Sequence, residues 1–185
     1  MKYIIIAALA GTAALFGCAA SAQQGVDFSK VEIKTTDLGN KTYMLEGQGG
    51  DITVAVGTDG IIMVDTQFAP LHDKIKAAIA AISPLPIKYV INTHYHGDHV
   101  GGNAAFHKDG AAIVAHDNIR IRMAAGTINA VSGNKTPPAE AGALPTQTFI
   151  VGDKKLEVGS RVSNMCTMPT PTATPGSYSP MLTCW

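Results

Sequence analysis

The sequence is poor in cysteine, in aromatic residues and in charge. Three Cys in 185 residues cannot form a framework of several bridges, so a small fold stapled by disulfides is excluded. Fourteen basic residues balance fourteen acidic ones, and a net charge of zero argues against nucleic acid or an anionic membrane as the main partner. Only 15% of residues are charged, but 46% are hydrophobic, which excludes a disordered chain. The length predicts one domain, with at most a small appendage.

Residues 1–22 have the pattern of a secretory signal peptide. Lys2 supplies a positive charge, and the uncharged apolar run after it is too short for a comfortable membrane span. Ala20-Ser21-Ala22 then forms a small-x-small cleavage site. Cys18 ends a segment similar to a lipoprotein box, so it is either a lipid anchor or an apolar leader residue. We therefore expect an exported protein, periplasmic or secreted, with no further membrane span.

The apolar pattern of the mature chain predicts alternating strands and helices. The expected strands are Val31–Thr35, Lys41–Leu45, Ile52–Val56, Ile61–Val64, Ile87–Ile91 and Ala111–Ala115. Two helices and a final hairpin around Gly152-Asp153 are expected over Leu71–Ile82, His116–Ala125 and Phe149–Val158. Two polar or Gly- and Pro-rich loops are expected over Asn92–Asn103 and Gly126–Thr146. This order predicts an α/β (α+β layered) fold.

The first of these loops gathers residue types that bind metal ions. Three of the six His and one Asp fall within six residues, as His94, His96, Asp98 and His99. His-x-His places two imidazoles on the same side of an extended loop, close enough for one metal ion. Asp98 and His99 follow a glycine and can face a second ion. The alternative is a polar loop whose His residues only form hydrogen bonds.

Nitrogen and carboxylate ligands of this kind suit Zn(II), and also Fe or Mn. A catalytic zinc uses three protein ligands and keeps one position for water, whose pKa the metal lowers to about 7. A second ion about 3.5–4 Å away would bind the substrate or its leaving group. The loop also follows a predicted buried strand, and active sites of open sheets lie beyond the carboxyl ends of strands.

The loop resembles the His-x-His-x-Asp-His motif of the metallo-beta-lactamase superfamily. The resemblance covers roughly Val31 to Val158. It includes Gly60–Thr66, similar to the family's strand ending in Asp-Thr, and Val114–His116, similar to the segment after the motif helix. It implies a four-layer αββα sandwich, a small-molecule substrate and two Zn(2+) ions in an intact site.

The resemblance also assigns roles to the four motif residues. It implies that His94 and His96 hold the first metal, and that Asp98 and His99 hold the second. Asp98 would in addition be the catalytic residue that orients or deprotonates the attacking water. Most hydrolases of the family need three more ligands downstream: a His, a bridging Asp and a second His. No His follows His116 in this sequence.

For several residues outside the motif, the sequence leaves more than one role open. Asp65 is either a partner that supports the motif loop or a cap at the end of a strand. His116 is expected to start a helix or to pack, and His72 and His107 to lie on the solvated surface. The glycine-rich segment Gly47–Gly50 is either a mobile flap over the site or a plain connecting loop.

The chain changes character after residue 159. Residues 1–22 are expected to form the signal peptide, 23–159 the metallo-beta-lactamase-like domain, and 160–185 an aberrant or disordered tail. The tail contains four Ser, five Thr and four Pro, one charged residue and no hydrophobic period. The domain is therefore expected to lack part of its second half, which leaves one side of a sheet exposed and predicts poor solubility.

The genetic code supports a frameshift as the origin of this tail. If each shifted codon takes the third base of one codon and two bases of the next, Met165-Cys166 must give Val and Met168-Pro169 must give Ala. With permitted third bases, the segment from Arg161 to Thr183 can then encode the family's next strand and its Ala-His-Ser/Thr ligand loop. The hypothesis is a frameshift near Gly159–Arg161, or an error in the sequence. Third bases that forbid this translation would contradict it.

Three functions remain open from the sequence. The first is an exported zinc-dependent hydrolase that attacks an ester, thioester, lactone or amide, with export favouring a beta-lactam-like amide or a lactone. The second is a di-iron redox protein of the same fold. The third is a truncated, non-enzymatic remnant that binds metal weakly or not at all. The sequence gives no substrate and no oligomeric state.

Overall fold

The computed structural model describes residues 26–128, 133, 135–150, 153–167 and 181–184. The expected signal peptide, Cys18 and the expected turn residue Gly152 lie outside these ranges. Within them, no helix has both the length and the apolar character needed to cross a membrane.

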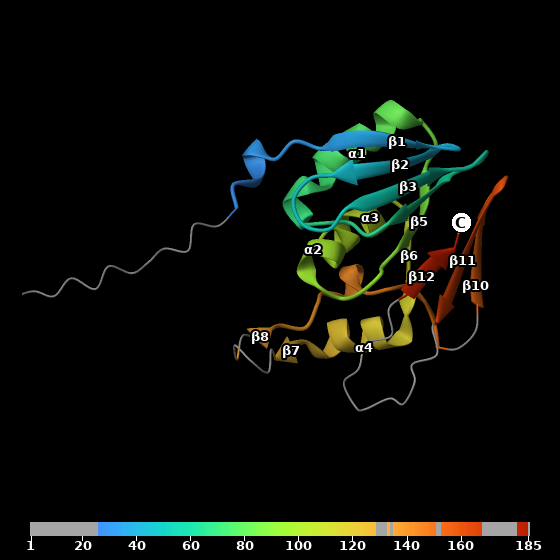
Figure 1. Cartoon of the computed structure of the whole chain (residues 1–185). Helices are drawn as coiled ribbons and strands as arrows, with labels where there is room; N and C mark the ends of the chain where they lie inside the picture. Colours follow the sequence, from blue (N-terminus) through green and yellow to red (C-terminus); the bar gives the residue numbers. More distant parts are fainter. Residues whose placement is uncertain (1–25, 129–132, 134, 151–152, 168–180, 185) are drawn as a thin grey trace, which may run out of the picture.

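A seven-stranded sheet forms the centre of the fold (Figure 1). Its strands, in spatial order, are β1 (Lys34–Gly39), β2 (Thr42–Glu46), β3 (Ile52–Val56), β4 (Ile61–Val64), β5 (Ile87–Ile91), β6 (Ala112–His116) and β9 (Gln147–Phe149). The first four strands pair antiparallel, and β4, β5, β6 and β9 pair parallel. The parallel strands therefore end at a common edge, where sites in such sheets lie.

Helices connect and cover these strands. They are η1 (Phe28–Lys30), η2 (Ala69–Leu71), α1 (His72–Ile82), α2 (Gly97–Val100), α3 (Asn103–Lys108), α4 (Asp117–Ala125) and η3 (Ala141–Ala143). A small ribbon of two strands follows α4, made of β7 (Thr127–Ile128) and β8 (Lys135–Thr136). The helix α1 crosses from β4 to the parallel strand β5, as a parallel connection requires.

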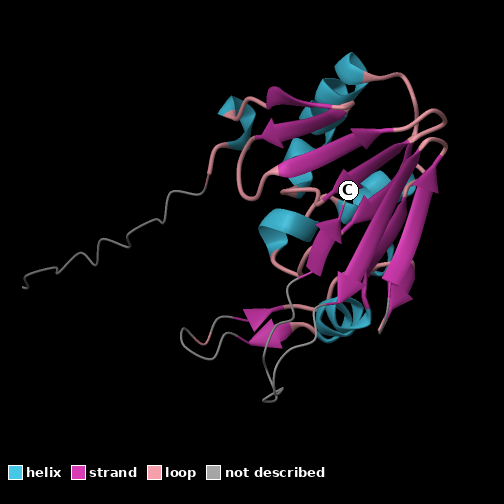
Figure 2. Cartoon of the chain, turned by 45° about the vertical axis from the view of Figure 1, so that its right-hand side comes forward, coloured by secondary structure: helices cyan, strands magenta, loops and turns pink. Residues whose placement is uncertain are grey.

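A second, three-stranded antiparallel sheet packs on the large sheet (Figure 2). It contains β10 (Asp153–Val158), β11 (Arg161–Thr167) and β12 (Met181–Cys184). Leu156, Val158 and Met165 of this sheet are buried against Ile62 and Val64 of β4. The described elements therefore form layers in the order helices, sheet and sheet, which confirms the layered α/β expectation.

The position of β4 between two packed layers explains why its sequence is apolar throughout. Ile61 and Met63 point to the helical layer and share a core cluster with Ile75 of α1. Ile62 and Val64 point the other way, into the cluster under the small sheet. All four side chains are buried, as expected for a strand covered on both faces. Full burial of such a side chain stabilises the fold by about 1.5–3 kcal/mol.

Most strand predictions are confirmed. The structure reproduces Ile52–Val56, Ile61–Val64 and Ile87–Ile91 to the residue. The first expected strand is displaced, since β1 runs from Lys34 to Gly39. The turn between β1 and β2 lies at Asn40 and Lys41, which adopt positive φ values of 49° and 56°, a conformation that Asn tolerates better than most residues.

The prediction of a Phe149–Val158 hairpin is wrong. Phe149 ends β9, which joins the large sheet beside β6, whereas β10 pairs with β11 in the small sheet. A short apolar repeat has the same pattern in both cases, and only tertiary packing distinguishes a hairpin from a change of sheet. The strand β11, which pairs with β10, lies in the Ser/Thr-rich segment after residue 160.

The two expected loops contain regular structure that the sequence did not indicate. The segment Asn92–Asn103 includes α2 and ends where α3 begins. The segment Gly126–Thr146 includes β7, β8 and η3. These elements span between two and six residues, which is too short for a hydrophobic period to be visible.

Candidate metal centre

Polar residues follow the parallel strands at their common edge. Asp65–Gln67 follow β4, the motif segment follows β5, and His116 ends β6. The loop between β2 and β3 reaches the same place, because its glycines lie against Asp98 and His99. The candidate centre is therefore built by segments that are distant in sequence.

The motif residues lie on an extended segment and on the helix that follows it. His96 is the N-cap of α2, and its carbonyl accepts hydrogen bonds from the N–H groups of His99 (3.0 Å) and Val100 (3.1 Å). The ring centroid of His94 is 4.8 Å from that of His96 and 3.9 Å from that of His99. The three imidazoles thus gather at one point, although Asp98 and His99 lie on a helical turn and not on a loop.

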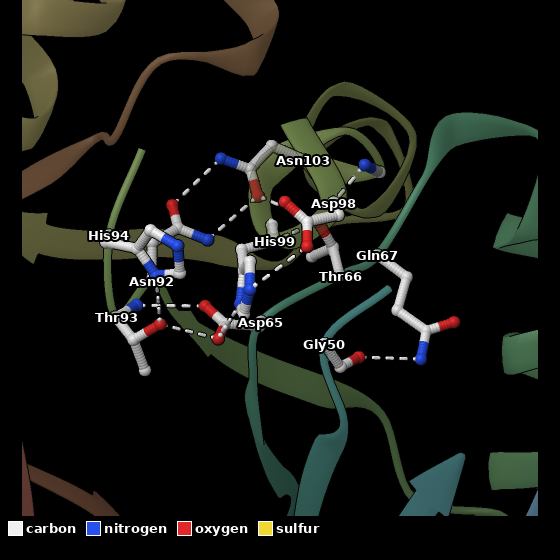
Figure 3. A network of polar contacts seen from close by, with 11 residues as sticks. Gly50, Asp65, Thr66, Gln67, Asn92, Thr93, His94, Asp98, His99 and Asn103 are labelled. Atoms are coloured by element: carbon white, nitrogen blue, oxygen red, sulfur yellow. Dashed lines mark hydrogen bonds and ion pairs between the residues drawn. The ribbon is translucent and has the colours of Figure 1, made fainter. Parts of the chain in front are cut away.

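A buried carboxylate holds the motif segment in place (Figure 3). Asp65 is 3% exposed, and its Oδ2 accepts hydrogen bonds from His99 Nδ1 (2.8 Å) and Thr93 Oγ1 (2.6 Å). Its Oδ1 accepts the Thr93 N–H at 2.9 Å. The hypothesis that Asp65 supports the motif segment is confirmed. We assign the ring proton of His99 to Nδ1 because its partner is a carboxylate, and this leaves Nε2 for a metal.

The second pair of motif residues has a spacing that suits one metal ion. His99 Nε2 and Asp98 Oδ2 lie 3.4 Å apart. Two ligands of a tetrahedral zinc, each about 2.0–2.1 Å from the ion, lie about 3.3 Å apart. Within the described ranges, no three or more His, Cys, Asp or Glu residues are placed to hold a metal together. The donors therefore fit zinc in chemical type and, for Asp98 and His99, in spacing, and each ion needs a further ligand.

Burial and neighbouring groups shift the pKa values of His94 and His99 in opposite directions. The hydrogen bond to Asp65 raises the pKa of His99 above its ordinary value, against the opposing effect of burial. Burial lowers the pKa of His94, and the nearby charge on His99 lowers it further. The lowered pKa favours the neutral form of His94, the one that binds metal ions.

A buried amide network fixes the helix behind the motif. The side chains of Asn92 and Asn103 exchange two hydrogen bonds, of 3.0 and 2.8 Å, and both residues are fully buried. Asn103 also donates to the carbonyl of Ala143 (3.0 Å). Thr66 Oγ1 accepts the N–H of Gly102 at 3.1 Å. None of these residues was expected at the site from the sequence, and their one local signal is their polar character directly beside buried elements.

The histidines outside the motif have structural partners. His116 Nδ1 accepts the N–H of Asn118 (3.1 Å), and its Nε2 donates to the carbonyl of Ile150 (3.0 Å). The prediction that His116 starts a helix is confirmed, since it is the N-cap of α4. His107 is exposed and donates to the carbonyl of Ala111, as expected near the surface.

The expectation that His72 is a solvated surface residue is wrong. Its side chain is only 15% exposed and contacts Asp73 and Asp109 through its two ring nitrogens. Its ring also packs edge-on against Phe106, with the ring centroids 4.7 Å apart. The buried Phe106 comes from α3, so this environment depends on a contact between elements distant in sequence.

Comparisons with known proteins agree with this fold. The family model of the metallo-beta-lactamase superfamily matches residues 45–183. No curated protein matches the chain. Among solved structures, a subclass B3 metallo-beta-lactamase of Bradyrhizobium japonicum is 22% identical with a TM-score of 0.62, and the match covers 77% of this chain and 55% of that one.

Two further structures give the same result. A metallo-beta-lactamase of Cronobacter sakazakii is 18% identical with a TM-score of 0.63, over 81% of this chain and 56% of that one. A metallo-beta-lactamase from Novosphingobium pentaromativorans is 20% identical with a TM-score of 0.62, over 79% of this chain and 56% of that one. The chain thus spans little more than half the length of these structures. Because the family model matches more than half of its residues, the chain belongs to the metallo-beta-lactamase superfamily.

Proposed function

We propose that this chain is an exported zinc-dependent hydrolase, or a part of one, that cleaves an ester, lactone or amide bond of a small molecule. The fold supports a metal-dependent hydrolase. The observation that carries the proposal is the row Asp65–His99–Asp98, in which a buried carboxylate orients a histidine toward a second carboxylate. Metal-binding histidines are supported in this way.

In this proposal the four motif residues bind two zinc ions. His94 and His96 would hold a first zinc, and Asp98 and His99 a second. When bound, zinc supplies the Lewis acidity that lowers the pKa of a water to about 7. Asp98 would orient the attacking water through a carboxylate oxygen and would accept its proton. Asp65 keeps the His99 ring from rotating, because it holds Nδ1 at 2.8 Å.

A beta-lactam or a related cyclic amide or ester is the substrate class that we favour. Three solved structures of the same fold are named metallo-beta-lactamases. The pattern of residues 1–22 supports export, to the periplasm or the medium, where such compounds are met. An exported location is less suited to the cytoplasmic thioesters that other hydrolases use.

Each half of the centre has two donors among the residues that the structure describes, whereas a catalytic zinc uses three protein ligands. We therefore expect the 185-residue chain by itself to bind zinc weakly and to turn over slowly. The alternative function is a non-enzymatic remnant, and it is favoured by the lack of a group of three donors within the described residues. The frameshift hypothesis predicts the missing His and Asp ligands in a second reading frame beyond Gly159.

The test is a zinc titration of the full chain, with hydrolysis of a chromogenic beta-lactam, a lactone and an ester measured in parallel. His96→Ala removes one proposed ligand and should weaken zinc binding by more than about tenfold. His107→Ala is the matched control, because it removes an exposed histidine that only donates to a backbone carbonyl. It should leave zinc binding and hydrolysis unchanged.

Zinc binding that depends on His96 and not on His107 supports the proposal. Hydrolysis without metal dependence, or equal zinc affinity in both variants and the wild type, would contradict it. Preferential binding of iron with redox activity would favour the di-iron alternative. Turnover at the rate of an intact enzyme would contradict the expected weakness of this chain.

A further inference from the structure

Gln67 is a fully buried polar residue that no role in the proposed chemistry explains. It lies just after β4, two residues from Asp65, and has a positive φ of 51°. A non-glycine residue in this conformation is uncommon, and its surroundings must favour it. Buried amide side chains also need hydrogen-bond partners, because an unsatisfied one is costly.

Both ends of the Gln67 amide bind the loop between β2 and β3. Its Nε2 donates to the carbonyl of Gly50 at 2.7 Å (Figure 3), and its Oε1 accepts the N–H of Gln48 at 3.3 Å. A Cβ on Gly47 would lie 2.6 Å from the same Oε1. The side chain therefore spans the loop Gly47–Gly50 and fixes its backbone at two points. We call this arrangement the Gln67 clamp.

The clamped loop lies directly on the motif residues. A Cβ on Gly50 would lie 2.2 Å from Cε1 of His99, and one on Gly49 would lie 2.8 Å from Cβ of Asp98. Real Cβ atoms do not approach this closely, so side chains on the loop would displace either the loop or the motif. Gly49 also has a φ of 98°, which favours glycine. The backbone of the loop thus forms one wall around His99 and Asp98.

We propose that Gln67 is a positioning residue that holds this glycine wall against His99 and Asp98. The His99 ring is then fixed on two sides, by Asp65 at Nδ1 and by the backbone of Gly50 at its Cε1 edge. Loss of the clamp frees the loop, and the two motif residues gain other rotamers. The inference rests on the proposed function only where it takes His99 and Asp98 as metal ligands.

Gln67→Met tests the clamp, because methionine has a similar length and lacks both polar ends. Gln147→Met is the matched control, since it makes the same chemical change on β9. Two quantities are measured on the full chain: amide hydrogen exchange of Gln48 without metal, and the dissociation constant of zinc. We expect Gln67→Met to accelerate exchange at Gln48 and to weaken zinc binding by about tenfold. The control should change neither quantity.

Gly50→Ala disturbs the wall where it meets His99, because its Cβ would lie 2.2 Å from Cε1 of that ring, and it leaves the Gln67 side chain intact. It should displace the loop from His99 and weaken zinc binding. If both substitutions act through the position of one loop, their combined effect on zinc affinity is smaller than the product of the separate effects. Independent, multiplying effects would overturn the clamp as the common cause.

The two proposals fail in different ways. Unchanged exchange at Gln48 in Gln67→Met overturns the clamp. Faster exchange with wild-type zinc affinity overturns the positioning role. Absence of zinc binding by the wild-type chain contradicts the proposed function, whereas the exchange of Gln48 still decides whether the clamp exists.

Discussion

The carboxylate of Asp65 and the imidazole of His99 lie 2.8 Å apart, from Oδ2 to Nδ1, and join the end of β4 to the first turn of α2. The carboxylate is buried and accepts two further hydrogen bonds from Thr93. A buried charge is tolerated only where partners satisfy it. Asp65 therefore serves both the local fold and the orientation of the proposed ligand.

Asp65→Asn should weaken zinc binding by about 10- to 100-fold, because the histidine loses its charged partner. Asparagine has a similar size and tolerates the positive φ of 63° at this position. Its NH2 group takes the place of the oxygen that accepts the His99 N–H, so that two donors face each other. We therefore also expect a loss of about 1–3 kcal/mol in the free energy of unfolding. Zinc titration and chemical unfolding of the metal-free chain measure the two effects.

Thr93→Val is the matched control for that experiment. It removes the 2.6 Å hydrogen bond from the hydroxyl to Asp65 and the 3.1 Å contact of the same oxygen with Nδ1 of His94, and it leaves the bond between Asp65 and His99 in place. Stability should fall by about 0.5–1.5 kcal/mol, and zinc affinity should fall less than in Asp65→Asn. Equal zinc affinity in Asp65→Asn and the wild type would remove Asp65 from the metal centre.

His116 provides a test that separates a structural histidine from a ligand. It caps α4 through Nδ1 and donates from Nε2 to Ile150, so neither ring nitrogen is free for a metal. His116→Ala should lower stability by about 1 kcal/mol, whereas His116→Asn retains a capping oxygen and should lower it less. Both variants should bind zinc as the wild type does. Weaker zinc binding in both would mean that His116 is a ligand.

Features that depend on neighbouring residues can be predicted from the sequence, whereas contacts between distant segments cannot. The strands β3, β4 and β5 were predicted to the residue, because continuous or alternating apolar residues give a strong local signal. Asp65 was singled out from its place at a strand end. Gln67, only two residues later, was not, since its partners lie 17 and 19 residues earlier in the chain. Contacts of that kind have no local pattern.

The buried amide pair Asn92–Asn103 should be strongly coupled. Each side chain satisfies the other through two hydrogen bonds in a fully buried site. Asn103→Ala leaves the amide of Asn92 without these bonds and should cost about 1–3 kcal/mol. The double substitution to alanine should cost less than the sum of the single ones, which unfolding of all four proteins in urea would measure. Additive costs would show that the pair is not an energetic unit.

The ion pair between α1 and the end of α3 should make stability depend on pH. The Lys76 ammonium, 2.6 Å from Asp109, and then the His72 ring, hold the pKa of the Asp109 carboxyl below its ordinary value. Because the folded pKa lies below the unfolded one, the stabilisation is present above about pH 4 and is lost as the pH falls through the folded pKa.

The side chain of Asp109 is 35% exposed, so solvent screens this pair and its contribution should be at most about 1 kcal/mol. Asp109→Asn should therefore unfold at lower urea than the wild type at pH 7, and the difference should shrink at pH 3 and in high salt. Asp73→Asn is the control, because its carboxylate is 97% exposed and should contribute little at any pH. A difference for Asp109→Asn that grows as the pH falls would contradict the assigned sign, and with it the role of the Lys76–Asp109 pair in joining these helices.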